Sequence, residues 1–230
     1  MDVLWLAVRD AISLLVGGDS ETYEIIFRSL RVSLTATVVA FALGLPLGML
    51  VAFGRFPGRR LVQALVNTGM GMPPVVIGLF VTVMLWRNGP IGALELLYTP
   101  TAMVIAQAAI AVPLVAGFSA ASLQQVDPEF RVQMEALGAT RARAFWTVAV
   151  EARLPLLGAV MAGFGAVVSE VGAASMVGGN IDGETRVLTT AAVMEASRGD
   201  FPAAIAYGLI LLLIAFAVIF VLTLAQQRGR

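Results

Sequence analysis

The sequence has no cysteine, no histidine and no lysine, and these absences exclude several classes of function. Without cysteine there are no disulfides and no thiol chemistry. Without histidine, the usual zinc sites, imidazole bases and histidine-based triads are absent. All fifteen basic residues are arginine, so the lysine of a phosphate-binding loop, G-x-x-x-x-G-K-[ST], is missing. The chain is therefore not expected to hydrolyse ATP itself.

Charge is also scarce. Only 13% of the 230 residues are charged and 59% are hydrophobic, with a mean hydropathy of +0.89, whereas roughly a quarter of the residues in soluble domains are charged. The net charge is zero, so no basic field favours nucleic-acid binding. This composition predicts a multi-pass protein of a cell membrane, in contact with the lipid bilayer.

Five stretches with little or no charge are long enough to cross a bilayer, which takes about 20 apolar residues. They cover residues 32–54, 61–86, 96–126, 154–181 and 201–227. The expected fold class is therefore all-α and polytopic, with a membrane domain over residues 25–226.

Residues 1–24 differ from these stretches. The segment LWLAVRDAISLLVGG is too short and too charged to span comfortably. Its apolar residues fall on one helical face, namely Leu4, Val8, Ala11, Ile12 and Leu15. We expect an amphipathic helix at the membrane interface, with a sixth, weakly hydrophobic span as the alternative.

Five spans place the loops on two sides. One side contains residues 55–60, residues 127–153 and the C-terminal tail, and it has nine of the fifteen arginines, at positions 55, 59, 60, 131, 141, 143, 153, 228 and 230. Basic loops stay cytoplasmic, so we expect this side to face the cytoplasm and the N-terminus to face outward.

Glycine and proline interrupt the spans. Close helix packing with kinks explains such residues in many membrane bundles, while broken helices that line a pathway are the alternative. Pro73 and Pro74 are the best candidates for a true break, since two adjacent rings in mid-span disturb the backbone hydrogen bonds.

The charged stretch 127–153 predicts two short helices that meet at a glycine. Asp127 and Pro128 suit the start of the first helix, and Gly138 suits its end in a left-handed conformation. Thr140 is a candidate cap for the second. A solvated loop is one interpretation. A DNA-binding helix-turn-helix is disfavoured because no basic recognition face is present.

The third interpretation is a docking element for a cytoplasmic partner. The apolar residues of this stretch would then fill a pocket on that partner; they are Phe130, Met134, Leu137 and Phe145.

The segment VQMEALGATRARAFWTVAV resembles the E-A-A loop of binding-protein-dependent ABC importer permeases, with Gly138 at the glycine position. Val132 stands where that pattern has an acidic residue. The segments EARLP and SEVGAASMVGGNIDGETRVLTTAAVMEASRGDF are similar to the oxyanion branch of the family, above all to tungstate permeases and more distantly to molybdate and sulfate permeases. The resemblance covers about residues 25 to 225.

The resemblance implies a coupling loop that sits in a groove of an ATPase subunit. We assign to it Phe130, Gln133, Met134, Glu135, Ala136, Leu137, Gly138, Ala139, Thr140 and Phe145. It further implies a homodimer, two cytoplasmic ATPase subunits that hold ATP and magnesium, and an extracytoplasmic oxyanion-binding protein. No cofactor is expected in the chain itself.

Glu170 lies inside the fourth stretch, where a carboxylate is costly. It is either a proton or cation site, as in an ion-coupled secondary transporter, or a structural carboxylate that accepts hydrogen bonds. We favour the structural role, because a fixed negative charge does not help an anion pathway.

The charge-free stretches contain no arginine, so we expect a weakly binding anion pathway made of hydroxyl groups and backbone amides. Its candidates are Ser33, Thr35, Thr37, Thr82 and Ser169, with the break at Pro73 and Pro74. For the external mouth we expect a turn followed by a helix that Thr185 caps. There the loop either attracts the anion or docks the binding protein; its candidates are Gly178, Gly179, Asn180, Thr185 and Arg186.

Overall fold

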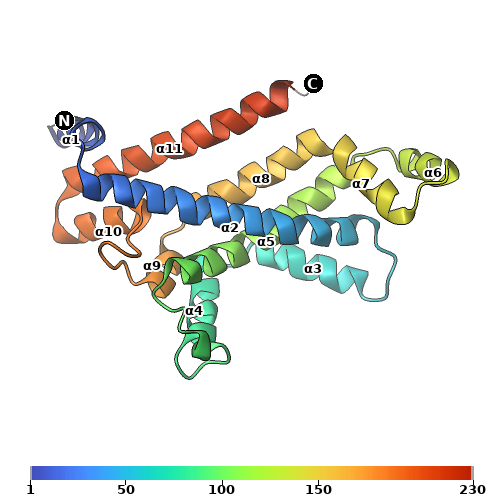
Figure 1. The fold of residues 1–230 in the computed structure, drawn as a ribbon, viewed down its shortest axis with the longest axis horizontal. Coiled ribbons are helices and arrows are strands. Elements are labelled where there is room, and N and C mark those ends of the chain that lie inside the picture. Colours follow the sequence, from blue (N-terminus) through green and yellow to red (C-terminus); the bar gives the residue numbers. More distant parts are fainter. Residues whose placement is uncertain (1, 229–230) are drawn as a thin grey trace.

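The structure is a computed structural model that describes residues 2–228, without the side chains at positions 2, 128, 131, 135 and 141. All regular secondary structure in this part is helical, as expected (Figure 1). In chain order the helices are α1 (Asp2–Val16), α2 (Ser20–Phe53), α3 (Arg59–Met70), α4 (Pro74–Leu85), the short 3₁₀ helix η1 (Gly92–Leu94), α5 (Pro100–Gln124), α6 (Pro128–Ala136), α7 (Arg141–Glu151), α8 (Arg153–Val168), α9 (Gly172–Gly178), α10 (Leu188–Arg198) and α11 (Phe201–Arg228).

Three of the described helices, α2, α5 and α11, are each long and apolar enough to cross a membrane. Two bent pairs, α3 with α4 and α7 with α8, raise the number to five if each pair counts as one span. Five spans are therefore compatible with the helices, although two of the five are not straight.

Helix α2 begins twelve residues before the expected start of the first span, at Ser20 instead of residue 32. Asp19 caps it by accepting a hydrogen bond from the Thr22 N–H at 3.1 Å, and the hydrogen bonds from Thr22 lower the pKa of Asp19. Arginine and glutamate are good helix formers. A charged residue can therefore interrupt an apolar stretch of the sequence while the helix continues through it. Arg28 and Arg31 consequently belong to α2.

The core is built on close contact between α2 and α5. A Cβ atom on Gly44 would lie 2.9 Å from Val115, and one on Gly48 would lie 2.7 Å from the carbonyl oxygen of Ala116. The later glycine of α2 contacts the later residue of α5, so the two helices run parallel. Small residues at the crossing let the backbones approach, and the remaining helices pack around this pair.

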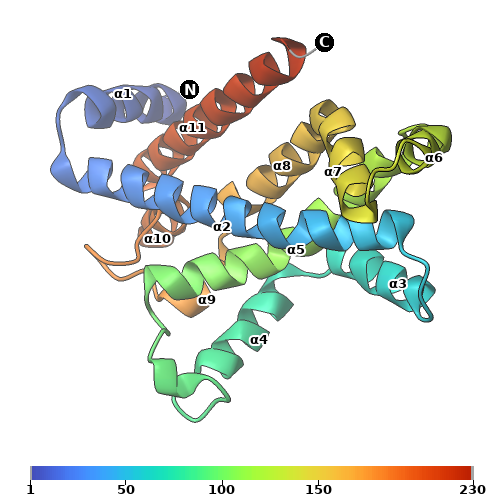
Figure 2. The ribbon, with the colours of Figure 1, turned by 45° about the vertical axis from the view of Figure 1, so that its right-hand side comes forward.

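The expected break at Pro73 and Pro74 is confirmed. Helix α3 ends at Met70, α4 begins at Pro74, and the two axes differ by 105°. Helix α4 and the loop after it project from the body of the molecule in both ribbon views (Figures 1 and 2).

The fourth stretch is also broken, which the sequence did not predict. Helix α8 ends at Val168 and a separate short helix, α9, begins at Gly172. The turn between them contains Ser169 and Glu170, so the carboxylate lies at a helix junction and not within a continuous span.

The N-terminal helix is confirmed, but the expected apolar face was partly wrong. Ala7 and Ala11 are buried, while Leu4, Val8 and Ile12 are exposed. Helix α1 packs against α11, because alanines permit a close approach while the bulkier side chains point outward. Its position at the membrane interface stays a prediction.

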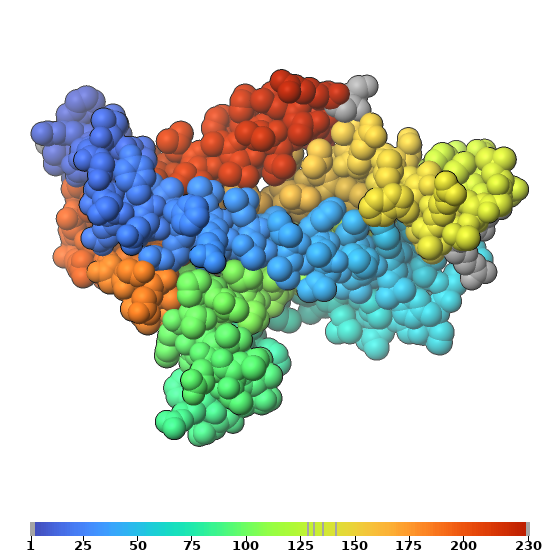
Figure 3. All heavy atoms as spheres, viewed as in Figure 1, coloured from blue at the N-terminus to red at the C-terminus, as the bar shows by residue number. Residues whose placement is uncertain are grey.

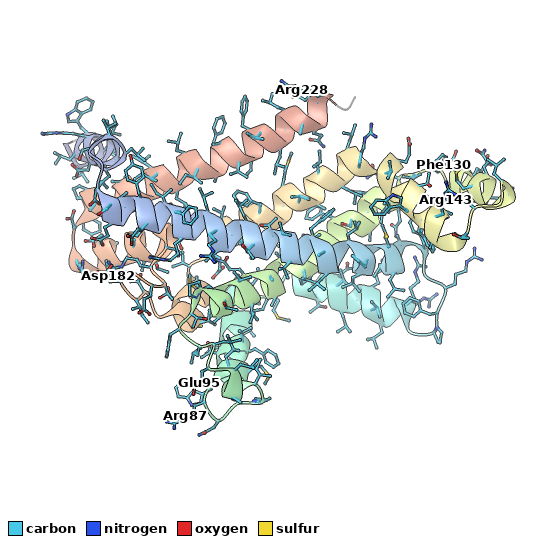
Figure 4. The ribbon with its side chains drawn as sticks, in the orientation of Figure 1. Arg87, Glu95, Phe130, Arg143, Asp182 and Arg228 are labelled. Carbon is cyan, nitrogen blue, oxygen red and sulfur yellow. The ribbon has the colours of Figure 1, made fainter. Side chains whose placement is uncertain are left out.

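Two segments assigned to the cytoplasmic side lie at one end of the molecule, and the loop that contains Asp182, assigned to the other side, lies at the opposite end. Phe130 and Arg143 lie at one end of the long axis and Asp182 lies at the other (Figure 4). The α2–α3 connection lies at the same end as α6 and α7 (Figure 1). The α2–α3 connection and the coupling loop are thus grouped at one end, whereas Arg228, at the end of α11, lies nearer the middle of the long axis (Figure 4).

We expect Gly48→Ala to lower the stability of the protein by about 1–3 kcal/mol, because the new methyl group has to displace the backbone of α5. Gly158→Ala is the matched control, since no atom lies within 4 Å of the position where its Cβ would be. Thermal denaturation in detergent measures both. Equal midpoints for the two variants would contradict the close packing of α2 on α5.

Candidate functional site

The coupling loop forms two short helices around a glycine, as predicted. The Glu129 N–H donates to the Asp127 Oδ1 at 2.9 Å, and the Arg143 N–H donates to the Thr140 Oγ1 at 3.3 Å. Gly138 has a φ of +84°, a conformation that residues with a side chain rarely adopt. The predicted caps and corner of this element are therefore confirmed.

The exposed apolar surface of the loop is smaller than the sequence indicated. Leu137 is 79% exposed and Val132 is also exposed. Phe130 instead packs against a buried cluster around Val148, and the Phe145 ring stacks on Phe53 of α2 with 5.7 Å between centroids. The expectation that both phenylalanines are free for a partner was therefore wrong, because both rings already pack against other residues of this chain.

The other residues of the coupling loop divide by exposure. Gln133, Ala136, Gly138 and Thr140 are exposed, and Met134 and Ala139 are half-buried. The side chain of Glu135 lies outside the described residues. A partner would therefore meet a surface centred on Leu137 and the glycine corner.

Helix α7 connects this surface to the membrane helices. Its buried residues Ala144, Val148 and Ala149 face inward, and the bend at Ala152 turns the chain by 77° into α8. The Phe53–Phe145 stack also joins α7 to α2, so α7 is attached to both α8 and α2.

Glu170 has a structural role in the junction between α8 and α9. Its Oε1 accepts a hydrogen bond from the Ala173 N–H at 2.7 Å, and its backbone carbonyl accepts one from the Thr189 hydroxyl at 3.0 Å. The residue is buried. The carboxylate thus satisfies an N–H group at the start of α9, which would otherwise lack a partner.

The predicted pathway hydroxyls do not form one cluster. Thr37, Thr82 and Ser169 each donate their hydroxyl hydrogen to a carbonyl oxygen of their own helix, at 2.7 to 2.8 Å. A hydroxyl has one hydrogen to donate, so in this conformation these three offer none to an anion. Ser33 lines a narrow buried gap beside Gln107, and Thr35 lines a larger cavity.

Thr185 does not cap a helix, contrary to the prediction. It is buried, and its hydroxyl donates to the Gly178 carbonyl at 2.6 Å and accepts from the Ile181 N–H at 2.9 Å. Helix α10 begins after Val187, whose backbone groups bond to the Thr190 hydroxyl. Thr185 therefore closes the 178–185 loop on itself. Gly179 and Asn180 turn this loop with φ values of +73° and +51°.

The guanidinium of Arg186 is also engaged by other residues of this chain. Its Nη1 lies 3.2 Å from the Glu21 Oε1 and 3.0 Å from the Asp182 Oδ1, and only 12% of its side chain is exposed. Two carboxylates neutralise one guanidinium, so Arg186 attaches the outer loop to the start of α2 and is a poor anion attractor. The expected anion role for this residue is therefore not supported.

Sequence reasoning missed Arg28 and Arg31. They lie on α2, near the outer end of the molecule, which is the end opposite the coupling loop. They line an open cavity of about 630 Å³ between α2 and α5, together with Thr35 and Thr101. The spacing of Arg28, Arg31 and Thr35 along one helical face was the available signal. The charges at these positions indicate a loop before the first span, whereas α2 continues through them.

Comparison with known protein families decides which class of membrane protein this is. Residues 44–230 match the family described as binding-protein-dependent transport system inner membrane component. The chain belongs to this family. It is therefore a multi-pass permease of the inner membrane, the component of an ABC importer that is separate from the ATPase.

Relatives of the permease match it over nearly its full length. The tungstate uptake system permease protein TupB of Peptoclostridium acidaminophilum is 41% identical over 95% of this chain and 96% of its own length. TupB of Campylobacter jejuni is 30% identical over 96% and 92%. A solved structure of the MetNI methionine ABC transporter has the same fold, with a TM-score of 0.69 at 21% identity, covering 94% of each chain.

Membership of the family confirms the resemblance found in the coupling loop, and it implies ATPase and binding-protein partners for the permease. The loop occupies one end of the molecule, where a separate component can reach it (Figure 4). The assignment of individual coupling and pathway residues remains a proposal.

We expect Glu170→Ala to destabilise the permease by about 1 kcal/mol or more, because the Ala173 N–H loses its buried acceptor. Glu170→Gln keeps an acceptor oxygen and should stay closer to the wild type. Thermal denaturation in detergent compares the two variants. Uptake by Glu170→Gln should have the same pH dependence as wild type, and a shifted pH profile would instead indicate a proton site.

Proposed function

We propose that the chain is the permease subunit of a tungstate importer. It acts as a homodimer with two cytoplasmic ATPase subunits, which hold ATP and magnesium, and with an extracytoplasmic oxyanion-binding protein. Alternating access in the permease is driven by ATP hydrolysis in the partner. The observation that carries the cargo is the similarity, along almost the whole chain, to two tungstate uptake permeases from different organisms.

The exposed apolar surface of α4 supports the homodimer. Val76, Leu79, Phe80 and Val83 are exposed on this helix, whereas Gly78 on its other face lies against Ala173 of α9. Figure 3 shows the segment around α4 as a lobe apart from the body. A second copy packed on this lobe would enclose a path along the two-fold axis.

The route of coupling follows from the contacts of α7. We infer that the ATPase holds Leu137 and the Gly138 corner in a groove. When the ATPase subunits close, α7 moves as a lever, and the Ala152 corner and the Phe53–Phe145 stack carry the motion into α8 and α2. The joint at Ser169 and Glu170 then lets α8 move relative to α9.

An ion-coupled secondary transporter that uses Glu170 is the rival function. The hydrogen bond from the Ala173 N–H argues against it, because this carboxylate oxygen is already used to hold the start of α9. Uptake that depends on ATP and on the ATPase subunit favours the importer, and uptake that follows a proton or sodium gradient favours the rival.

Gly138→Val should uncouple ATP hydrolysis from transport. A β-branched residue is strained by about 1–2 kcal/mol at positive φ, while no atom lies within 4 Å of the added Cβ. The substitution therefore changes the corner without creating a clash. Gly138→Asn is the matched control, since asparagine tolerates this conformation. Transport and ATP hydrolysis are measured in the purified complex, and full transport by Gly138→Val would refute the coupling role.

The permease alone should bind labelled tungstate weakly, because selectivity resides in the binding protein. In proteoliposomes that contain the full complex, molybdate should compete with tungstate for uptake. Binding of micromolar affinity or tighter by the isolated permease would overturn the weak pathway. Competition by sulfate but not by molybdate would overturn the cargo.

A further inference from the structure

The cavity at the outer end of α2 and α5 has a graded polar wall. Glu24, Arg28, Arg31 and Thr35 of α2 line it. Their spacings of four, three and four residues place them on one helical face. At 1.5 Å per residue, Arg31 lies about 10 Å further along α2 than Glu24, and Thr35 lies about 6 Å beyond Arg31. Along α2, from Glu24 toward Thr35, the side chains that line the wall are therefore first acidic, then basic, and finally a hydroxyl.

The two arginines of this wall have different roles. The Nη1 of Arg28 donates to the Arg186 carbonyl at 3.0 Å, and its Nη2 donates to the Gly183 carbonyl at 2.6 Å. Glu24 lies 3.8 Å from the same guanidinium. Arg28 thus holds the outer loop in place, and its charge is already balanced by Glu24.

Arg31 is not engaged in this way. It is exposed to the cavity, and it makes no hydrogen bond or ion pair with any residue that the structure describes. Across the cavity lies the first turn of α5, which contributes Pro100 and Thr101. The N-terminus of a helix carries a partial positive charge, and the Thr101 hydroxyl can donate a hydrogen bond.

We propose that this cavity is the first oxyanion site of the permease and that Arg31 is its contact residue. The inference rests on the proposed function. A guanidinium presents several N–H groups in a plane and can bind two oxygens of a tetrahedral dianion at once. The cavity is much larger than one such anion, so the ion keeps part of its water and is held weakly.

Weak binding suits a site that has to release its ligand inward. Glu184 is exposed and lines the same cavity, so its negative charge opposes the entry of a dianion and limits the affinity of the site. Removal of this charge should therefore have an effect opposite in sign to the removal of Arg31.

The test uses the full complex, with its ATPase and binding protein, in proteoliposomes. We measure tungstate imported per ATP hydrolysed, and ATP hydrolysis stimulated by the binding protein. Arg31→Gln should lower the import per ATP by about tenfold, the loss expected for one charge-assisted hydrogen bond, and stimulation should persist. Arg31→Lys should recover part of the loss.

Two further variants define the outcome. Arg9→Gln, on α1, removes an exposed cation that does not line the cavity, and it should match wild type. Glu184→Gln should leave import equal or higher. The site is refuted if Arg31→Gln behaves like Arg9→Gln. It is also refuted if Arg31→Gln and Glu184→Gln both lose stimulation and excess binding protein restores it, since the cavity would then be a docking surface.

Failure of the proposed function has a separate signature. A wild-type complex that imports neither tungstate nor molybdate would overturn the importer's cargo, and with it the anion assigned to this cavity. Import by the wild type together with an unchanged Arg31→Gln variant would overturn the site alone.

Discussion

In the hydrocarbon interior of a membrane no water is available to backbone N–H and C=O groups, so the protein itself has to satisfy each break in a helix. The junction between α8 and α9 meets this requirement with Glu170, which accepts from the Ala173 N–H, and with Thr189, which donates to the Glu170 carbonyl. Thr185 does the same for the loop after α9. These residues satisfy the backbone where the helices are broken, and we propose that the spans of the importer move at such breaks.

Between the breaks the helices are tightly packed, above all α2 on α5. Gly44 and Gly48 bring α2 against α5 so closely that a single methyl group would collide with the neighbouring helix. The chain changes direction at a few corners, such as Ala152 and the turn before Pro74, and we propose that motion driven by the ATPase is concentrated there. In this proposal the coupling loop joins a rigid pair of helices to a hinge.

Charged groups are concentrated at the two ends of the molecule, for different reasons. At one end the coupling loop and the α2–α3 connection are arginine-rich, as the cytoplasmic side of a membrane protein usually is. At the other end Arg186 and Arg28 attach the outer loop to α2, through carboxylates and carbonyl oxygens respectively. Of Arg28, Arg31 and Arg186, only Arg31 faces open space. Arg28 and Arg186 are therefore structural cations, and Arg31 is the candidate anion contact.

The sequence by itself determined the membrane class, the helix break at Pro73 and Pro74 and the caps of the coupling loop. Each of these depends on local properties: apolar length, ring constraints at Pro73 and Pro74, and the short polar side chains of Asp127 and Thr140. Tertiary structure alone decided which of the apolar and charged side chains are free. Phe145 is stacked on Phe53, Arg186 is neutralised by Glu21, and Arg31 has no partner among the residues that the structure describes. Such contacts join residues up to 165 positions apart, and local patterns carry no information about them.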